Sequence, residues 1–469
     1  MPVSTAEVAA LLGATVAGVP SDAVLTADVE VDSRRAAPGS LFVALPGERS
    51  DGHDHAAAAV RAGALAALTS RPLDGVPCLV VPDPLRAVQD LARALYPRAP
   101  EPLTVGITGS SGKTSTKDLL AQVLAGHGPT LAPQGSFNNE LGLPLTALRR
   151  TAQTRFAALE YSARGVGHIA FLCSIVAPHV AVVLNVGSAH VGEFGGRDRI
   201  AVAKGELVEA ARTCAVLNAD DPLVLAMASR TSRPVLTFGT GADADVRAEA
   251  VELDDEGRPR FRLVSAHGSG DVALRVHGEH QVSNALATAA AALAAGLADV
   301  PRTAALLSAA TAQSRWRMEV TERPDGVTVV NDAYNANPES MRAALKTLAV
   351  MSQGKARRTV AVLGVMAELG DAARDAHMDL GRFAVRLDVG QLVVVGPDAG
   401  GIHAGAVLEG SWGDESVHVP DVEAAVALLR RELTPGDVVL VKASRSAGLE
   451  RVAAALLDDA PPSATGARA

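Results

Sequence analysis

GITGSSGKTSTK, residues 106–117, directly follows the apolar run LTV at 103–105. A strand that runs into glycines and then into a Lys-Thr pair predicts a phosphate-binding loop, because glycines let the backbone turn and the amides of a helix N-terminus attract anions. Lys113 would add a point charge at the β- and γ-phosphates, and Thr114 would offer a hydroxyl to Mg²⁺. We assign phosphate binding to Thr108, Gly109, Ser110, Ser111, Gly112, Lys113, Thr114 and Ser115.

The loop is shorter than the usual Walker pattern, which has four residues between its first glycine and the Gly-Lys pair. Only two residues separate Gly109 from Gly112. A GTPase would carry an Asn-Lys-x-Asp guanine reader, and the sequence has none. A kinase or simple ATPase would need an acidic residue at a strand end, and Glu160, which closes FAALE, could serve. The loop alone leaves these classes open, and a glycine-rich turn that binds nothing is a further alternative.

Composition indicates a globular protein of several domains. The 469 residues exceed what one core supports, and 48% are hydrophobic while 20% are charged. No apolar run approaches the roughly 18–20 residues that span a bilayer. The three cysteines are far apart and form no CxxC, so neither a disulfide framework nor a cysteine metal site is expected. The net charge of -9 argues against a nucleic-acid partner bound through a broad basic face.

The N-terminus is rich in Ala, Val and Leu but lacks the basic region of a signal peptide. Ser4 followed by Glu7 is typical of a helix capping box, and Gly13 is a stop signal. We therefore expect the first helix of a cytoplasmic protein.

Two joints divide the chain, the proline-rich YPRAPEP at 96–102 and the stretch TAQSRWRM at 311–318. Each resulting piece is near ordinary domain size. The predicted division is domains at residues 1–100, 101–312 and 313–459, and a disordered tail at 460–469.

Short apolar runs alternate with helical patterns in the second and third pieces, which predicts parallel sheets buried between helix layers. We expect a mixed α/β N-terminal domain, a central P-loop parallel-sheet domain with a small antiparallel β insert at 245–277, and a C-terminal Rossmann-like α/β domain. The central strands are expected at 103–108, 156–161, 180–186, 214–219 and 234–238, and the C-terminal ones at 327–332, 359–364, 391–396 and 437–444.

Three stretches after the loop carry further candidate residues. NNELGLP at 138–144 has turn chemistry, and its adjacent amides, Asn138 and Asn139, suit carbonyls and carboxylates. VVLNVGSAH at 182–190 places His190 just past the carboxyl end of a strand, where such sheets bind ligands. Lys204 follows within a helical pattern. Taken singly, a turn, a structural histidine and a solvated lysine are the ordinary interpretations.

Taken together, these spacings resemble those of the Mur ligases, the ATP-dependent amide ligases of peptidoglycan precursor synthesis. TGSSGKT is similar to that family's short phosphate loop. The resemblance implies Thr114, Glu160 and His190 as magnesium ligands. It also implies that Lys204 is carried as a carbamate, whose carboxylate helps to hold a second Mg²⁺.

The resemblance extends to both remaining sides of the nucleotide. HGEHQVSNALATAAAA at 277–292 resembles the adenine-side segment, with Asn284 as its asparagine. RMEV supplies Arg317 for the γ-phosphate from the domain joint, and NDAYNANPESM supplies Asp332 for the ribose. Asn335 and Asn337 are implied near the substrate.

The first domain resembles the family's uridine-nucleotide domain over DSRRAAPGSLFVALPGERSDGHDH, residues 32–55. This implies Ser33, Arg34 and Gly47 as substrate contacts. The branch of the family with the most similar segments uses a UDP-N-acetylmuramoyl-tripeptide and D-alanyl-D-alanine, so these are the expected partners of a monomeric enzyme. A zinc site in DGHDH is the rival, and no second cluster of ligands supports it.

The implied reaction is carboxylate activation by ATP and Mg²⁺. The tripeptide carboxylate would attack the γ-phosphate, and the dipeptide amine would then displace phosphate from the acyl phosphate. Lys113, Glu160, His190, Lys204 and Arg317 are the expected catalytic residues. The C-terminal domain would close on ATP by hinge motion near 311–316 and bind the dipeptide.

Four residues depart from the family pattern and put acceptor choice in doubt. Two alternatives therefore stay open. One is a Mur-type ligase with another amino-acid or peptide acceptor, including folate-polyglutamate-like chemistry. The other is a catalytically weak paralogue that binds nucleotide and acts as a partner protein. The departing residues are Tyr161, Ser162, Val365 and Ala443.

Overall fold

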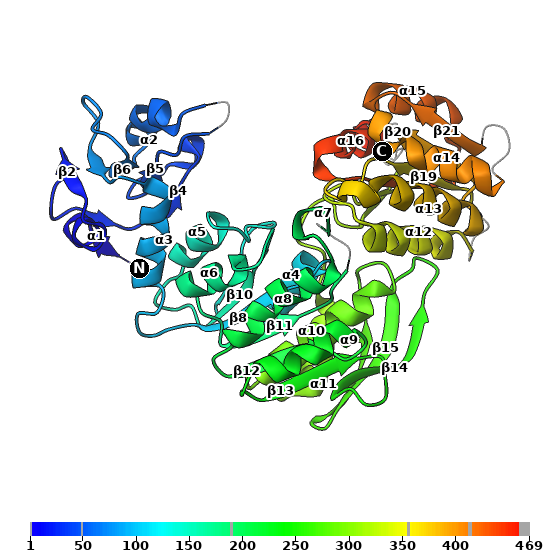
Figure 1. The fold of residues 1–469 in the computed structure, drawn as a ribbon, viewed down its shortest axis with the longest axis horizontal. Helices are drawn as coiled ribbons and strands as arrows, with labels where there is room; N and C mark the ends of the chain where they lie inside the picture. Colours follow the sequence, from blue (N-terminus) through cyan, green and yellow to red (C-terminus); the bar gives the residue numbers. More distant parts are fainter. Residues whose placement is uncertain (1, 48–49, 188–190, 354–356, 411–414, 459–469) are drawn as a thin grey trace, which may run out of the picture.

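The computed structural model describes residues 2–47, 50–187, 191–353, 357–410 and 415–458. Three α/β parts follow one another along an open arc, with the central part at its bend (Figure 1). Each part has its own main sheet. The predicted architecture of a mixed N-terminal part, a central parallel sheet and a C-terminal α/β part is confirmed. His190 and the predicted tail at 460–469 lie outside the described residues.

The N-terminal part is built on a five-stranded sheet in the order β2-β7-β6-β5-β4, beside the short pair β1 and β3. The N-cap half of the predicted capping box forms, because the Ser4 hydroxyl accepts the N–H of Glu7 at 3.1 Å, while the Glu7 carboxylate pairs with Arg98 at 2.7 Å. Gly13 ends the helix at φ +59°, as predicted. The strands are β1 Val3–Ser4, β2 Thr15–Ala17, β3 Val24–Leu25, β4 Val29–Glu30, β5 Leu41–Val43, β6 Ala66–Thr69 and β7 Cys78–Val80; the helices are α1 Thr5–Leu12, α2 Ala56–Arg61 and α3 Pro84–Leu95, with 3-10 turns η1 Ser33–Arg35 and η2 Gly52–His55.

The central part carries a nine-stranded sheet in the order β16-β15-β14-β13-β12-β11-β8-β10-β9. Its first six strands in the chain pair in parallel, and the last three form antiparallel pairs with one another. The predicted antiparallel insert is therefore present, and it extends the main sheet through the pairing of β13 with β14. The strands are β8 Leu103–Thr108, β9 Thr130–Leu131, β10 Phe156–Glu160, β11 Val180–Val183, β12 Cys214–Asn218, β13 Val235–Gly239, β14 Val246–Leu253, β15 Pro259–Ser265 and β16 Gly268–Ala273.

Helices cover this sheet on both faces (Figure 1). They are α4 Lys113–Ala125, α5 Gly142–Leu148, α6 His168–Ile175, α7 Val191–Phe194, α8 Arg197–Glu209, α9 Pro222–Leu225, α10 His280–Ala294 and α11 Val300–Ala309, with the 3-10 turn η3 Ala226–Arg230.

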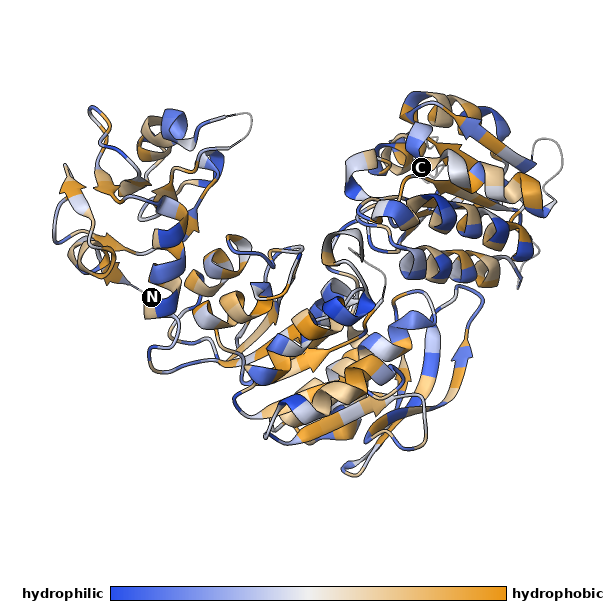
Figure 2. Cartoon of the chain, viewed as in Figure 1, coloured by the Kyte–Doolittle hydropathy of each residue, from blue (hydrophilic) through white to orange (hydrophobic). Residues whose placement is uncertain are grey.

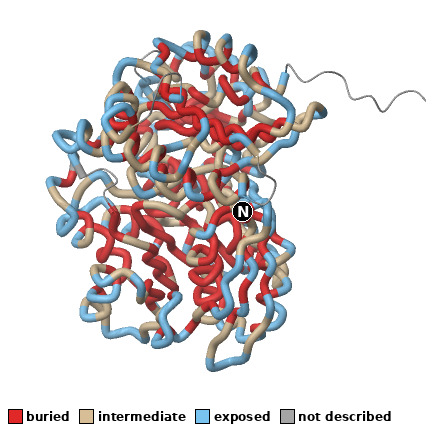
Figure 3. Tube along the Cα trace, turned by 90° about the vertical axis from the view of Figure 1, so that its right-hand side faces the viewer, coloured by how far each residue is buried: buried red, intermediate tan, exposed pale blue. Residues whose placement is uncertain are grey.

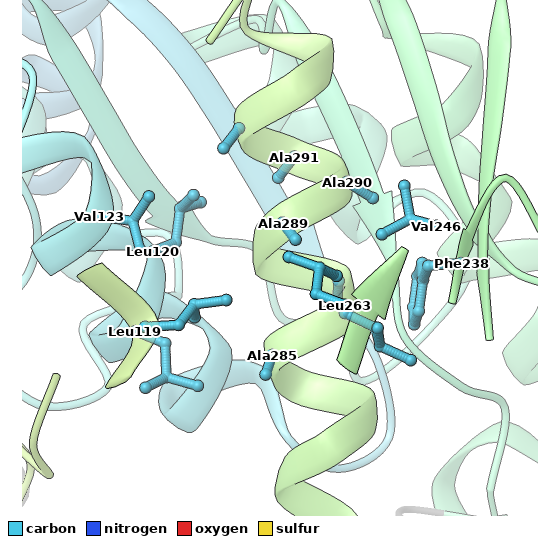
Figure 4. Packing of buried hydrophobic residues seen from close by; sticks show 14 of the residues in the cluster. Leu119, Leu120, Val123, Phe238, Val246, Leu263, Ala285, Ala289, Ala290 and Ala291 are labelled. Carbon is cyan, nitrogen blue, oxygen red and sulfur yellow. The ribbon is translucent and has the colours of Figure 1, made fainter. Parts of the chain in front are cut away.

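The alanine-rich helix α10 is the centre of the main core. Figure 4 shows its small side chains between Leu120 and Val123 of α4 on one side and Phe238, Val246 and Leu263 of the strands on the other. Alanine has no bulk beyond Cβ, so a helix lined with it can approach its neighbours closely at native packing density. The packing fixes α4, the helix that begins at the predicted phosphate loop.

The C-terminal part has a six-stranded sheet in the order β17-β18-β22-β19-β20-β21, parallel except for β17. Side chains of successive strand residues point to opposite faces of the sheet and pack into two separate hydrophobic cores, one on each face. The inner strands β18, β22, β19 and β20 are fully buried, whereas the edge strand β17 is polar and largely exposed; most other polar and exposed residues lie on loops and outer helix faces (Figures 2 and 3). The elements are β17 Glu319–Glu322, β18 Thr328–Asn331, α12 Pro338–Gln353, β19 Thr359–Leu363, η4 Gly370–Ala372, α13 Ala373–Arg386, β20 Gln391–Val395, η5 Pro397–Ala399, α14 Gly400–Glu409, β21 Ser416–Val419, α15 Val422–Glu432, β22 Val438–Lys442, η7 Arg445–Ala447 and α16 Glu450–Asp458.

The joint at 96–102 is held by Arg150, a buried arginine of the central part. Its guanidinium donates to the carbonyls of Tyr96, Arg98 and Pro100, the last two at 2.7 and 2.8 Å. One side chain thus satisfies several backbone acceptors where α3 runs into β8. Among the described residues, no helix has both the length and the apolar character needed to cross a membrane.

Candidate functional site

The predicted phosphate loop connects β8 to α4 at the carboxyl edge of the central sheet. Gly112 has φ +82°, and a Cβ there would lie 2.5 Å from the Asn284 side-chain oxygen, so this position requires glycine. Asn185, which follows β11, fixes the loop from outside. Its carbonyl accepts the N–H of Ser110 at 3.1 Å, and its side-chain oxygen accepts that of Ser111 at 2.9 Å.

Two lysines, Lys113 on the loop and Lys204 on α8, lie in surroundings that disfavour the charged ammonium form. Lys113 donates to the carbonyl of Gly109 at 2.6 Å. Burial lowers its pKa to about 8, while Glu160 acts in the opposite direction. Lys204, buried on α8, has its pKa lowered well below the ordinary value by burial and by the positive charge of Lys113. The structure thus places the two predicted lysines within electrostatic reach of each other.

The predicted magnesium residues Thr114 and Glu160 lie together. The Thr114 hydroxyl donates to Glu160 Oε2 at 3.3 Å and is 2.9 Å from the Ser136 hydroxyl. Asn138 donates to the same carboxylate oxygen at 3.1 Å. The other oxygen, Oε1, is buried and has no hydrogen-bond partner among the residues that the structure describes. A buried carboxylate with an unused oxygen is an available ligand for a hard cation.

The C-terminal part contributes residues from the opposite side. Arg317 donates to the Ser136 hydroxyl at 3.1 Å, and its guanidinium lies over the Tyr334 ring, 4.3 Å from the centroid. Asp332 forms an ion pair with the buried ammonium of Lys442 at 2.7 Å. Asn284, on α10, accepts from the Thr116 hydroxyl at 3.2 Å, so the predicted adenine-side residue lies against the loop helix.

A cleft of ≈ 830 Å³ lies between the central and C-terminal parts. Several lining residues have acid, base or amide side chains suited to a charged ligand, and the volume is in the range of small-molecule sites. Lys204, Thr108 and Gly109 are not among the lining residues. The predicted residues that line it are Ser110, Ser111, Gly112, Lys113, Thr114, Ser115, Asn138, Asn139, Glu160, Asn284, Arg317, Asp332, Asn335 and Asn337.

Two of the four predicted substrate amides also cap helices. The Asn139 side chain accepts the N–H of Gly142 at 2.8 Å at the start of α5. Asn337 accepts the N–H of Ser340 at 2.8 Å at the start of α12. Capping occupies the side-chain oxygen and leaves the amide N–H groups available.

Ser33, Arg34 and Gly47 belong to the N-terminal part and do not line this cleft. Arg34 pairs with Asp32 through both guanidinium and backbone N–H groups, and these hydrogen bonds lower the pKa of Asp32 to about 2. The Arg34 side chain is 87% exposed, so the contact is a surface ion pair. The structure therefore separates the predicted uridine contacts from the nucleotide-side residues.

The four departures from the family pattern occupy different environments. Tyr161 is fully buried and donates to the carbonyl of Val176 at 2.7 Å. Ala443 is also buried, and neither it nor Val365 lines the cleft. Ser162 is the departure that does line it, with its hydroxyl donating to the carbonyl of Asn138 at 2.9 Å. Of the four departures, Ser162 is therefore the one in position to contact a ligand in this cleft.

Several site residues escaped the sequence interpretation. The loop partner Asn185 and the hydroxyl of Ser136 occur in unremarkable loop sequence. Gln281 accepts from the Asn284 amide at 2.8 Å, and Tyr334 and Lys442 support Arg317 and Asp332. VLNVG beside His190 was the available signal for Asn185, because it follows a buried parallel strand.

Comparison with known families gives three matches along the chain. Residues 27–96 match the Mur ligase family, catalytic domain; residues 107–292 match the Mur ligase middle domain; and residues 316–445 match the Mur ligase, glutamate ligase domain. The resemblance inferred from the sequence motifs is thereby confirmed.

Individual relatives align over nearly their whole length. The chain is 50% identical to the UDP-N-acetylmuramoyl-tripeptide–D-alanyl-D-alanine ligase of Mycobacterium tuberculosis, covering 97% of this chain and 98% of the relative. It is 36% identical to the ligase of the same name from Escherichia coli, over 92% and 94%. A crystal structure of MurF from Acinetobacter baumannii superposes with a TM-score of 0.86 at 32% identity, over 98% and 99%. A Thermotoga maritima MurF ligase in complex with ADP gives 0.78 at 30% identity, over 93% and 98%.

Proposed function

The chain belongs to the Mur ligase family, and we infer from this that it joins D-alanyl-D-alanine to the terminal carboxylate of a UDP-N-acetylmuramoyl-tripeptide. It is an ATP-dependent amide-forming ligase, and the products are UDP-N-acetylmuramoyl-pentapeptide, ADP and phosphate. The observation that carries the proposal is the cleft in which the phosphate loop faces Arg317 and Asp332 from the C-terminal part.

The nucleotide would lie across this cleft. The loop amides and Lys113 suit the β- and γ-phosphates, Asn284 the adenine side and Asp332 the ribose hydroxyls. Arg317 is within hydrogen-bond distance of Ser136, which also contacts Thr114. A guanidinium in that position would stabilise negative charge that develops on the transferring phosphoryl group.

Mg²⁺ fits the residues around Glu160. The unused Oε1 of the buried carboxylate and the adjacent Thr114 hydroxyl are oxygen ligands of the kind that Mg²⁺ prefers. When bound, the ion would supply charge neutralisation at the phosphates. We assign His190 and Lys204 to a second ion.

Lys204 would carry the carbamate of that second site. Its amine is buried on α8 near Lys113, an environment in which the charged ammonium is disfavoured. Carbamylation replaces the ammonium by a carboxylate, which Lys113 would attract. As a carbamate, the Lys204 side chain would thus be an anion that Lys113 stabilises and that can bind a metal ion.

The chain's own residues would mainly orient the reactants. The tripeptide carboxylate attacks the γ-phosphate and releases ADP, which leaves an acyl phosphate. The dipeptide amine attacks the acyl carbon, and phosphate leaves with one carboxylate oxygen. Lys113 and Arg317 would hold the phosphoryl oxygens, while Asn138, which lines the cleft and donates to Glu160, would help to hold the incoming carboxylate.

The N-terminal part would hold the uridine end through Ser33, Arg34 and Gly47, at a distance from the chemistry. The C-terminal part would bind the dipeptide, with Asn335 and Asn337 on its side of the cleft. We further propose that the enzyme acts as a cytoplasmic monomer, since ATP and the UDP-linked tripeptide are water-soluble and residues of one copy of the chain suffice to line the cleft.

ADP release tests the proposal. Turnover is measured with ATP, Mg²⁺ and UDP-N-acetylmuramoyl-tripeptide, with D-alanyl-D-alanine, L-alanyl-L-alanine, D-glutamate or no acceptor. We expect turnover that depends on the D,D-dipeptide. Equal or faster turnover with another acceptor would assign the enzyme to the alternative of a Mur-type ligase of different specificity. No turnover with any acceptor would favour the nucleotide-binding paralogue.

A further inference from the structure

Helix α4, which begins at the phosphate loop, also grips the linker between the central and C-terminal parts. Asp118 Oδ2 accepts the backbone N–H of Ser314 at 2.9 Å, and Oδ1 accepts its hydroxyl at 3.2 Å. One turn further along, Gln122 donates to the carbonyl of Thr311 at 2.8 Å and accepts its N–H at 3.0 Å. Residues four apart lie on the same helix face, so the two side chains form one clamp.

The first residue of the clamp, Asp118, is buried in the protein interior. Asp118 is 6% exposed, and its carboxylate pairs with the ammonium of Lys117 at 2.5 Å. Lys117 is 3% exposed and also donates to the carbonyl of Pro133 at 3.1 Å. A buried carboxylate is tolerable only with such partners, and they prevent it from turning away from the linker.

The clamped linker leads directly to Arg317. The residues on either side, Trp316 and Met318, have φ of +60° and +49°, which side chains with a Cβ rarely adopt. Such a backbone persists only when its surroundings hold it. On the far side Met318 donates to Asp332 Oδ1 at 3.1 Å, and the Trp316 carbonyl accepts the N–H of Tyr334 at 3.2 Å. On the N-terminal side of Trp316, the α4 clamp holds the backbone through Ser314 and Thr311.

We propose that Asp118 and Gln122 are positioning residues for Arg317. They fix the strained segment to the same helix whose N-terminus holds the phosphates, so that the guanidinium and the phosphate loop keep one geometry. The inference rests on the proposed function, in which Arg317 contacts the transferring phosphoryl group. A misplacement of about 1 Å at such a group can lower the rate by roughly 10²-fold.

The test compares Asp118→Ala and Gln122→Leu with Asp299→Ala, a matched control. Asp299 accepts the N–H of Arg302 at 3.0 Å at the start of α11, so it caps the end of that helix opposite to the one that leads into the linker. We expect kcat to fall about 10- to 100-fold in the two clamp variants, with less than twofold change in the control. Gln122→Leu leaves the Lys117–Asp118 pair intact and decides the matter if Asp118→Ala does not fold.

Trp316 provides a readout that a general loss of stability would not move. The chain has two tryptophans, so the variants are made in a Trp412→Phe background in which Trp316 alone emits. Its ring contacts the Arg445 guanidinium at 4.3 Å, and release of the segment should shift its emission and lower its anisotropy at temperatures where the protein is folded.

Relative to the parent, kcat and Trp316 emission must both change in the clamp variants, and neither must change in the control. A clamp variant with unchanged kcat, or with lowered kcat but unchanged Trp316 emission, would overturn the inference. A parent enzyme without acceptor-dependent turnover would instead overturn the proposed function, and the two failures are therefore distinguishable.

Discussion

The protonation of Lys113 should make nucleotide affinity depend on pH, because its surroundings lower its pKa. Burial lowers its pKa from 10.5 to about 8 in the protein without ligand. Phosphate oxygens beside the ammonium would favour the charged form and return the pKa toward its ordinary value. The free protein then loses the lysine proton as the pH rises through about 8, whereas the complex keeps it.

The magnitude follows from linkage. The difference between 10.5 and about 8 is about 2.5 pH units, which at 1.36 kcal/mol per unit gives an upper limit of about 3.4 kcal/mol. Below pH 8 both states carry the charge, and affinity is constant. Above it, affinity falls by up to tenfold per pH unit, and the complex is expected to be about 30-fold weaker at pH 9.5 than at pH 7.

Isothermal titration of ADP with Mg²⁺ between pH 7 and 9.5 measures this effect. Repeating the titration in buffers of different ionisation enthalpy should reveal proton uptake on binding above pH 8. Lys113→Met should bind weakly at every pH without the break near 8, whereas Lys346→Met, which removes an exposed lysine of α12, should behave as the parent. A pH-independent affinity in the parent, or the same break in Lys113→Met, would refute the assignment.

Other residues give equally concrete expectations. Lys204→Ala should lower kcat by ~10²-fold or more and regain part of it with millimolar acetate or formate; full activity, or no rescue, would argue against a carbamate. Glu160→Gln should raise the Mg²⁺ concentration for half-maximal turnover by roughly tenfold or more, and an unchanged requirement would remove Glu160 from the metal site. Arg150→Met leaves the carbonyls of 96–100 without their donor and should lower the free energy of unfolding in urea by about 3 kcal/mol, whereas exposed Arg431→Met should change it by less than about 0.5.

Local sequence carried most of the information about the sheets and the phosphate loop. The strands at 103–108 and 156–160 are mostly apolar and almost entirely buried, apart from Thr104, Thr108 and Glu160 as polar members. A segment buried on both faces between helical patterns is typical of a parallel sheet. Gly112 indicated the turn, because a residue with left-handed backbone conformation at a helix start is usually glycine.

What could not be predicted depends on contacts between distant segments. The Asp118–Ser314 contact joins residues 196 positions apart, and no local pattern marks either one as a partner of the other. In the sequence, Ser136 is an ordinary loop serine; only the fold brings its hydroxyl into contact with both Thr114 and Arg317. From the sequence, all four departures put acceptor choice in doubt alike, whereas the structure buries Tyr161 away from the cleft and places Ser162 in its lining.

The central claim is that the γ-phosphate is transferred to a carboxylate. It is tested most directly with tripeptide substrate whose terminal carboxylate is labelled with ¹⁸O. The acyl-phosphate route requires one labelled oxygen to leave with phosphate when the D-alanyl-D-alanine amine attacks. Mass spectrometry of the released phosphate should therefore find one ¹⁸O atom per turnover. Phosphate without label, formed while ADP and ligated peptide accumulate, would contradict the account.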